Sequence, residues 1–179
     1  GTFTDLDDSF DLMISVGGDG TILRAITHVR DLDIPIVGIN TGRLGFLATI
    51  KRDDIIGALD QIFEGKYRIS KRSLLSVTTN QKESNFELDF ALNEVTVSRK
   101  NTTSMISIET WLDDEYLNSY WADGLIISTP TGSTGYSMSC GGPVIMPESD
   151  SLVITPIAPH NLNARPLVIS AKHKIRLNV

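Results

Sequence analysis

The sequence has a single cysteine, Cys140, among its 179 residues. One cysteine can form neither an internal disulfide nor a zinc cluster, which fits a reducing compartment, and we expect Cys140 to be a small buried side chain. No apolar run approaches the roughly 20 residues that a membrane-crossing helix needs, and the acidic start of the sequence is unlike a signal peptide. We therefore expect a cytoplasmic protein with no membrane partner.

Clusters of basic residues are also lacking. The 16 Lys and Arg residues are scattered among 22 Asp and Glu residues, for a formal net charge of -6. A protein that binds the phosphate backbone of nucleic acid gathers its cations on one face. We therefore expect no nucleic-acid partner, and any phosphate site must be local. The remaining composition, 41% hydrophobic and 21% charged, is that of an ordinary globular protein.

Both ends of the sequence look cut. The sequence starts on Gly1 rather than on methionine, and it stops inside the strand-like run 174–179. We expect that residues are missing at both ends, so that the chain is a truncated form of a longer protein.

The first part of the chain alternates between strand and helix patterns. An apolar run over 11–16 predicts a buried strand, the turn 17–20 closes it, and apolar residues over 22–29 recur at helical spacing. A second apolar run, 34–39, and a second amphipathic stretch, 55–63, repeat this pattern. Strands that alternate with helices imply a parallel sheet with crossover helices.

Two residues are expected to bound the second helix: Asp53 as its N-cap and Gly65 just after its end. Residues 1–68 are therefore predicted to be a fragment of a Rossmann-like α/β domain.

After Tyr67 the pattern changes to short runs rich in Val, Ile, Thr and Tyr. Turn residues such as Asn80-Gln81, Asn101-Thr102 and Asp113-Asp114 separate these runs, and no long helical period appears. Residues 69–179 are therefore predicted to form a mainly β, sandwich-like domain that is incomplete at its C-terminal end. The fold class is α/β followed by all-β.

The first chemical motif is the turn Gly17-Gly18-Asp19-Gly20-Thr21, between the strand and the helix. Free backbone N–H groups and the positive end of a helix dipole favour an anion at such a place. Glycines allow the backbone to approach a phosphate closely, and a carboxylate can accept the proton of an attacking hydroxyl. The alternative is a plain tight turn with Asp19 as the helix N-cap.

The second motif is Leu92-Asn93-Glu94-Val95, in a strand-like segment. An asparagine can pair with the edge of an adenine, and a glutamate can accept hydrogen bonds from ribose hydroxyls. Taken alone the pair is also a common surface dipeptide.

The third motif runs from Ala122 to Ser137 and is followed by Gly141-Gly142-Pro143. It predicts a buried strand that opens into a loop rich in hydroxyl groups and glycine. The loop's amides and hydroxyls can bind the phosphates and base edge of a nucleotide, and Tyr136 can pack on a ring. A plain turn is the alternative.

The Gly-Gly-Asp-Gly-Thr turn looks like the signature shared by NAD kinases, diacylglycerol and sphingosine kinases and, more loosely, 6-phosphofructokinases. The three motifs in this order, and the stretch 156–166 with its Pro-His-x-Leu-x-x-Arg-Pro pattern, resemble the NAD kinase family from Asp11 to about Ile169. Lipid kinases lack the second and third motifs. The resemblance implies transfer of a phosphoryl group from ATP or polyphosphate to the adenosine 2′-hydroxyl of NAD, which gives NADP.

The resemblance also implies roles for single residues. Asp19 would accept the proton of the 2′-hydroxyl, Gly20 would contact the nucleotide through its backbone, and Arg24 would offer charge to a phosphate. Asn93 and Glu94 would hold the adenosine. The loop would line the same pocket through Thr131, Thr134, Gly135, Tyr136, Ser137, Met138 and Ser139. Asp123 and the backbone around Ala158 would meet the nicotinamide end.

Further expectations follow from the same family. Mg²⁺ would accompany the phosphates, and the protein would be a homodimer or homotetramer whose subunits share active sites. His160 lies near the site or is structural, whereas His28 and His173 are structural. The sequence departs from the family at Trp121, where many relatives have a polar residue, and at Gly135, where alanine is common. Two other functions stay open: a diacylglycerol-type lipid kinase and a non-catalytic nucleotide-binding regulatory module.

Overall fold

The structure is a computed structural model that describes residues 6–43, 45–80, 88–100, 103–161 and 163–179. The chain forms two compact units, Gly1–Ile69 (unit 1) and Ser70–Val179 (unit 2). The expected turn residues Gln81, Asn101 and Thr102, and Leu162 of the Pro-His stretch, lie outside the described residues.

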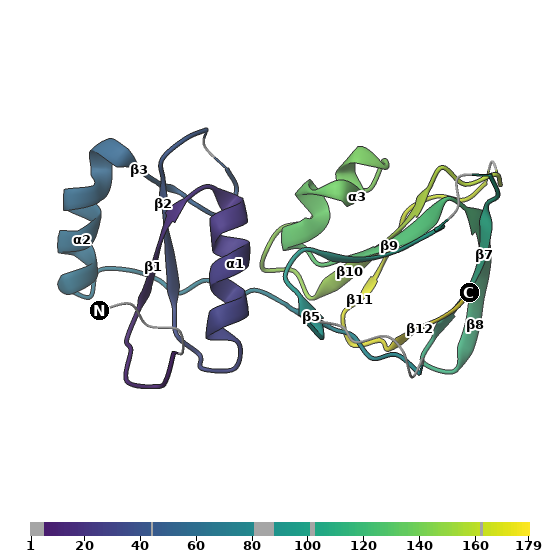
Figure 1. The fold of residues 1–179 in the computed structure, drawn as a ribbon, viewed down its shortest axis with the longest axis horizontal. Helices are drawn as coiled ribbons and strands as arrows, with labels where there is room; N and C mark the ends of the chain where they lie inside the picture. The colour runs from purple at the N-terminus through teal and green to yellow at the C-terminus, as the bar shows by residue number, and fades with distance from the viewer. Residues whose placement is uncertain (1–5, 44, 81–87, 101–102, 162) are drawn as a thin grey trace. The chain divides into compact units, whose positions relative to one another are not determined.

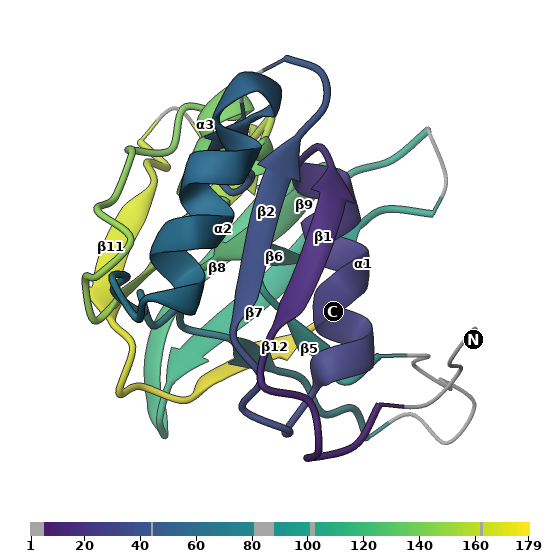
Figure 2. The same ribbon diagram turned by 90° about the vertical axis from the view of Figure 1, so that its left-hand side faces the viewer.

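Unit 1 is an α/β layer structure. Its elements are β1 (Met13–Gly17), α1 (Asp19–Val29), β2 (Ile36–Asn40), β3 (Ile50–Lys51), the 3₁₀ helix η1 (Arg52–Asp54) and α2 (Ile55–Phe63). The strands form a parallel sheet in the order β1-β2-β3. Figures 1 and 2 show α1 and α2 on opposite faces of this sheet. The predicted α/β pattern is confirmed, with β3 as a short strand that the pattern did not predict.

The helix ends show one wrong and one correct prediction. α2 begins at Ile55, after η1, and its N-cap is Asp54, so Asp53 is not the cap; the acidic residues form a tight turn of their own. Gly65 has a φ of +69° and donates its N–H to the carbonyl oxygen of Ile62 at 3.0 Å. A glycine in this conformation ends a helix, as predicted.

Unit 2 is a β-sandwich. Its strands are β4 (Leu75–Ser76), β5 (Phe90–Ala91), β6 (Glu94–Ser98), β7 (Ile106–Leu112), β8 (Glu115–Ala122), β9 (Gly124–Ser128), β10 (Ser151–Ile157), β11 (Leu167–Ser170) and β12 (Ile175–Asn178). One antiparallel sheet has the order β11-β10-β9-β6 and another the order β12-β7-β8, while β4 pairs with β5. Figure 1 shows the two larger sheets facing each other.

The core of unit 2 lies between these sheets and includes Ile108 and Tyr120 from one sheet and Leu125, Ile127 and Ile154 from the other. Leu125 and Ile127 are two residues apart on β9, so both lie on the same face of their sheet and point into this core. The predicted sandwich-like fold is confirmed. Asp113-Asp114 turns the chain between β7 and β8, as expected.

Two local predictions for unit 2 are wrong. The stretch after β9 is not a loop throughout, because it contains the 3₁₀ helix η2 (Thr131–Thr134) and the short helix α3 (Tyr136–Ser139). Cys140 follows α3 and is half-buried rather than buried. Its backbone N–H bonds to the carbonyl oxygens of Tyr136 and Ser137, so it closes the helix instead of filling the core.

Candidate functional site

In unit 1 the chemical motif lies where β1 ends and α1 begins. Gly18 is the N-cap of α1, and among the described residues it receives no side-chain capping bond. Gly18 and Gly20 are exposed at this helix start, and Arg24 is exposed one turn along α1. The first N–H groups of α1 and the positive end of its dipole are thus open to an anion.

The carboxylate of Asp19 is hydrogen-bonded to the segment that precedes β3. Its Oδ2 accepts a hydrogen bond from the N–H of Phe46 at 2.7 Å, and its Oδ1 accepts from the N–H groups of Leu47 and Ala48 at 3.0 Å each. Asp19 is the first residue of α1 and not its N-cap. The alternative that Asp19 merely caps the helix is therefore wrong.

These bonds determine the charge of Asp19. Burial acts to raise the pKa of Asp19, but the N–H groups of Ala48, Phe46 and Leu47 outweigh it, and the pKa lies below its usual value. A carboxylate has about four acceptor positions. Among the described residues, the three N–H groups fill two positions on Oδ1 and one on Oδ2, which leaves one position on Oδ2 for a further donor.

In unit 2 the structure brings the second and third motifs together. Glu94 pairs with Ser128 in the register of β6 and β9, and the N–H of Thr129 donates to the carbonyl oxygen of Asn93 at 2.9 Å. A Cβ built on Gly132 would overlap the backbone of Asn93, and one built on Gly135 would lie 3.2 Å from Oε2 of Glu94. The start of the loop therefore packs directly on the Asn-Glu pair.

Polar atoms at this junction lack partners. Among the described residues, Oδ1 of Asn93, Oε2 of Glu94 and Oγ1 of Thr131 are buried and form no hydrogen bond. Burial raises the pKa of Glu94 above its usual value. A buried polar atom without a partner costs about 1–3 kcal/mol, so a ligand or a water that bonds to these three atoms would stabilise the junction.

The predicted loop residues divide into exposed and inward-facing groups. Tyr136, Met138 and Ser139 are exposed on α3, and Thr134 and Gly135 are half-buried. Ser137 is fully buried, and its Oγ lies 2.8 Å from Oγ1 of Thr155, so its hydroxyl anchors α3 to β10.

The residues predicted for the nicotinamide end form a separate group. Oδ1 of Asp123 pairs with Nε of Arg99 at 3.1 Å, and its backbone N–H donates to the carbonyl oxygen of Ile157 at 2.9 Å. Ala158 follows β10 with a φ of 43°. The rings of Trp121 and His160 lie 4.5 Å apart. His160 is therefore beside this group, and its backbone N–H also bonds to the carbonyl oxygen of Trp121.

The two groups of unit 2 lie at opposite ends of β9. Glu94 pairs with Ser128 at one end of that strand, and Ser98 pairs with Gly124, next to Asp123, at the other. At about 3.4 Å per residue, the four steps between these ends amount to about 14 Å. The structure thus places Asn93, Glu94 and the loop together, and Asp123 with Ala158 apart from them.

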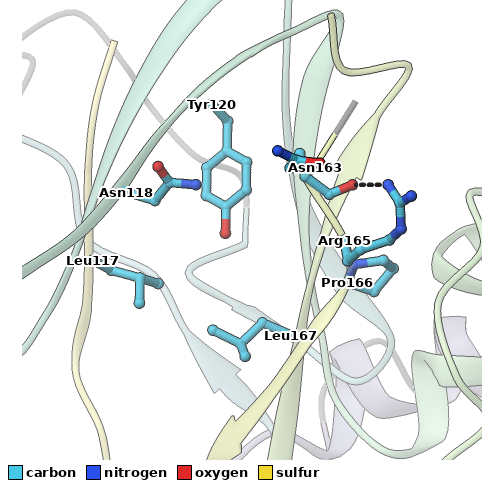
Figure 3. A pocket seen from close by; sticks show the side chains of 8 residues that line it. Leu117, Asn118, Tyr120, Asn163, Arg165, Pro166 and Leu167 are labelled. Carbon is cyan, nitrogen blue, oxygen red and sulfur yellow. Dashed lines mark hydrogen bonds between the residues drawn. The ribbon is translucent and has the colours of Figure 1, made fainter. Parts of the chain in front are cut away.

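Elsewhere in unit 2 lies a cavity of about 260 Å³, and Figure 3 shows the side chains that line it. It is lined from β8 by Leu117, Asn118 and Tyr120, and from the segment 163–167. None of the residues predicted for the site is among its described lining residues.

A metal cage is not formed by the described side chains, since no three or more His, Cys, Asp or Glu residues among them are grouped to hold an ion. No helix within the described part of the chain is long and apolar enough to cross a membrane.

Sequence reasoning missed the partners that hold the predicted residues in place. The segment of Gly45 and residues 46–48 surrounds Asp19, and Arg99 pairs with Asp123. The contacts of residues 46–48 with Asp19 carried no signal, because the backbone N–H groups that make them have no sequence pattern of their own. Arg99 carried no signal, because an ion pair between two elements has no sequence spacing of its own.

Comparison with known proteins gives matches over most of the chain. Residues 2–67 match the family described as ATP-NAD kinase N-terminal domain, and residues 92–179 match the ATP-NAD kinase C-terminal domain. The chain is 65% identical over 178 residues to the NAD kinase of Christiangramia forsetii, covering 99% of this chain and 60% of that protein. The chain thus spans about 60% of the length of the curated relatives it matches.

Two solved structures are also similar. The yeast NADH kinase complexed with NADH matches with a TM-score of 0.87 and 30% identity, over 95% of this chain and 50% of that one. The NAD kinase from Archaeoglobus fulgidus in complex with ATP matches with a TM-score of 0.79 and 31% identity, over 98% of this chain and 68% of that one.

Proposed function

The chain belongs to the NAD kinase family, and from this premise we propose that the protein transfers a phosphoryl group from ATP or polyphosphate to the adenosine 2′-hydroxyl of NAD, giving NADP. The observation that carries the proposal is the carboxylate of Asp19, held by three backbone N–H groups beside an open helix start. In this proposal the start of α1 binds a phosphate and the carboxylate of Asp19 accepts the proton, both within unit 1.

Asp19 acts as the base. Its lowered pKa keeps it ionised at neutral pH, with one acceptor position left on Oδ2. Such a carboxylate is a weak base, which suits phosphoryl transfer, because the hydroxyl proton becomes acidic only as the new oxygen-phosphorus bond forms. Gly20 offers backbone and Arg24 offers charge to the phosphates. Most of the rate enhancement then comes from alignment of the reacting groups.

Unit 2 supplies the acceptor site. Asn93 and Glu94 bind the adenosine, and the ligand provides hydrogen bonds to the buried atoms of Asn93, Glu94 and Thr131, which have no partner within the described residues. The exposed face of α3, with Tyr136, Met138 and Ser139, lines the same pocket together with Thr134, Gly135 and the backbone of Ser137.

Asp123 and Ala158 bind the nicotinamide end in a homodimer or homotetramer whose subunits share sites. Their separation from Asn93 and Glu94 along β9 supports this assignment, since one copy can serve the adenosine end of one NAD and the nicotinamide end of another.

Magnesium is part of the proposal as a companion of the substrate. Because the described residues offer no metal cage and the oxygens of Asp19 are largely occupied by N–H donors, the ion would be held by nucleotide phosphates and water. Bound in this way it would neutralise charge on the phosphates. We also propose that the enzyme is cytoplasmic, as its lone cysteine suggests.

The test uses the full-length protein. It is incubated with NAD, Mg²⁺ and either ATP or polyphosphate, and NADP is followed with an NADP-specific dehydrogenase, with Asp19→Asn in parallel. We expect NADP from the wild type and a loss of about 10²–10⁴-fold in kcat for the variant, with NAD binding retained. NAD binding without NADP formation from either donor would instead support the non-catalytic regulatory module. Absence of NAD binding would support the lipid kinase.

A further inference from the structure

The side chain of Asn40 connects the end of β2 to the segment that holds Asp19. Asn40 is 5% exposed. Its Nδ2 donates to the carbonyl oxygens of Arg43 at 2.9 Å and Ala48 at 3.3 Å, and its Oδ1 accepts from the N–H of Gly42 at 2.8 Å. One buried amide group therefore fixes both the start and the end of the connection between β2 and β3.

Ala48 is the residue at which two sets of hydrogen bonds meet. Its carbonyl oxygen accepts from Asn40, and its N–H donates to Oδ1 of Asp19. Ala48 is itself fully buried, so it has little freedom to shift. The position of Asn40 is fixed in turn by the pairing of β2 with β1, which sets Asn40 opposite Gly17 at the start of the motif turn.

Only an amide side chain can make all three of these hydrogen bonds. Asn40 uses both hydrogens of its NH₂ group and its oxygen at once. An aspartate of the same shape has acceptors only, so it would set a charged oxygen against two carbonyl oxygens. A serine would be too short to reach both ends of the segment. Neither replacement reproduces the three bonds.

We propose that Asn40 is a positioning residue for the reaction: it fixes the N–H groups of Phe46, Leu47 and Ala48 on Asp19, so that one acceptor position on Oδ2 is left for the 2′-hydroxyl. This inference rests on the proposed function, because it concerns the base of that reaction. Asn40 does not itself touch the substrate. Its effect passes through the carboxylate of Asp19.

The experiment compares Asn40→Asp and Asn40→Ser in the full-length protein, each alone and combined with Asp19→Asn. Misplacement of a reacting group by about 1 Å costs on the order of 10²-fold, so we expect kcat to fall by about 10–100-fold while KM for NAD changes less than about threefold. In the Asp19→Asn background the Asn40 substitutions should lower the residual rate by less than about threefold, because residues that act as a unit are not additive.

A matched control is Asn178→Ser. The Nδ2 of Asn178 also donates a side-chain hydrogen bond, to Oε2 of Glu109 at 3.0 Å, but on the exposed β12 of unit 2. We expect its kcat and KM to equal those of the wild type. Equal losses from the Asn40 substitutions with and without Asp19 would overturn the inference, since they would mark a purely structural role.

A second measurement does not depend on turnover. Carbon-13 NMR of the Asp19 carboxyl gives its pKa in the wild type and in Asn40→Ser, and we expect the pKa to rise when the N–H donors are released. An unchanged pKa would overturn the inference. If the wild type forms no NADP, the proposed function fails, and this titration still decides whether Asn40 positions the carboxylate. If Asn40→Asp does not fold, Asn40→Ser carries both measurements.

Discussion

Gly132 lies directly against the backbone of Asn93. A Cβ built on Gly132 would stand 2.6 Å from the Cα of Asn93 and closer still to its carbonyl group, which accepts a hydrogen bond from the N–H of Thr129. The loop after β9 can therefore reach the Asn-Glu pair only because residue 132 has no side chain. This contact joins two motifs that are about forty residues apart in the sequence.

Substitution of this glycine should separate the two motifs. Gly132→Ala has to push Asn93 or η2 away, so we expect it to destabilise unit 2 by about 1–3 kcal/mol and to weaken NAD binding at least about tenfold. Urea unfolding and isothermal titration with NAD measure the two effects. Wild-type stability and affinity in Gly132→Ala would contradict the packing described for this loop.

Gly135 provides the matched comparison. Its Cβ would lie 3.2 Å from Oε2 of Glu94 and 3.2 Å from the carbonyl oxygen of Gly132, which small shifts can relieve. Its φ of -93° lies outside the positive range that favours glycine. Gly135→Ala also introduces the residue that the family resemblance leads us to expect at this position. We expect a stability change below about 1 kcal/mol and NAD affinity within about tenfold of the wild type.

Substitution of Gly45 should be as damaging as substitution of Gly132, but it should act through Asp19, the proposed base. A Cβ on Gly45 would lie 2.5 Å from Oδ2 of Asp19 and closer to Oδ1. We expect Gly45→Ala to displace the carboxylate and to lower kcat by about 10–100-fold, with little change in the Kd of NAD. Gly57→Ala, in an exposed turn of α2 with open space around the new Cβ, should keep full activity and stabilise unit 1 by about 0.5–1 kcal/mol. Equal activities of the two variants would refute the prediction.

Much of this fold could be predicted from periodicity alone. The strand, turn and helix around Asp19 are local, since the apolar spacing and the glycines that specify them lie within twenty residues. The sandwich also follows from short β-rich runs between turns. Two of the wrong predictions, Asp53 as a cap and a loop throughout the stretch after β9, concern where short helical elements begin and end, and there several residues compete for one role.

The site itself is less visible in the sequence because its geometry depends on long-range contacts. The N–H groups that hold Asp19 come from 27 to 29 residues away. The side chain of Ser137 points inward because its hydroxyl bonds to Thr155 on β10. No sequence pattern predicts this contact between α3 and β10. Motif resemblance therefore selects the residues, whereas tertiary contacts decide what each one touches.

Removal of magnesium should separate binding from turnover. Because the described residues form no metal cage, NAD binding in excess EDTA should stay within about twofold of its value with Mg²⁺. NADP formation should fall to background and return when Mg²⁺ is added. Titration calorimetry and the coupled dehydrogenase assay measure these two properties. A large loss of NAD affinity in EDTA would show that the protein holds the ion itself.

Glu94 should lower the stability of the folded protein at neutral pH, although it contributes to NAD binding there. Its pKa is raised from the usual 4.5 by burial, so the folded protein holds this proton more tightly than the unfolded chain does. The stabilisation from the neutral form is complete below about pH 4.5 and is lost as the pH rises through the folded-state pKa. At pH 7 the ionised Glu94, which has no hydrogen bond to Oε2 among the described residues, therefore opposes folding.

Glu94→Gln tests this directly because glutamine is neutral at every pH. We expect the variant to be more stable than the wild type at pH 7 by up to about 1 kcal/mol, and the advantage to shrink by pH 4, while NAD binding at pH 7 weakens about tenfold or more. Urea unfolding at the two pH values gives the stabilities. Glu115→Gln, at an exposed position of the same unit, should show no such pH-dependent gain. If Glu94→Gln is less stable than the wild type at pH 7, then the carboxylate has a partner in the folded protein, and its role as an unpaired acceptor kept for the ribose is refuted.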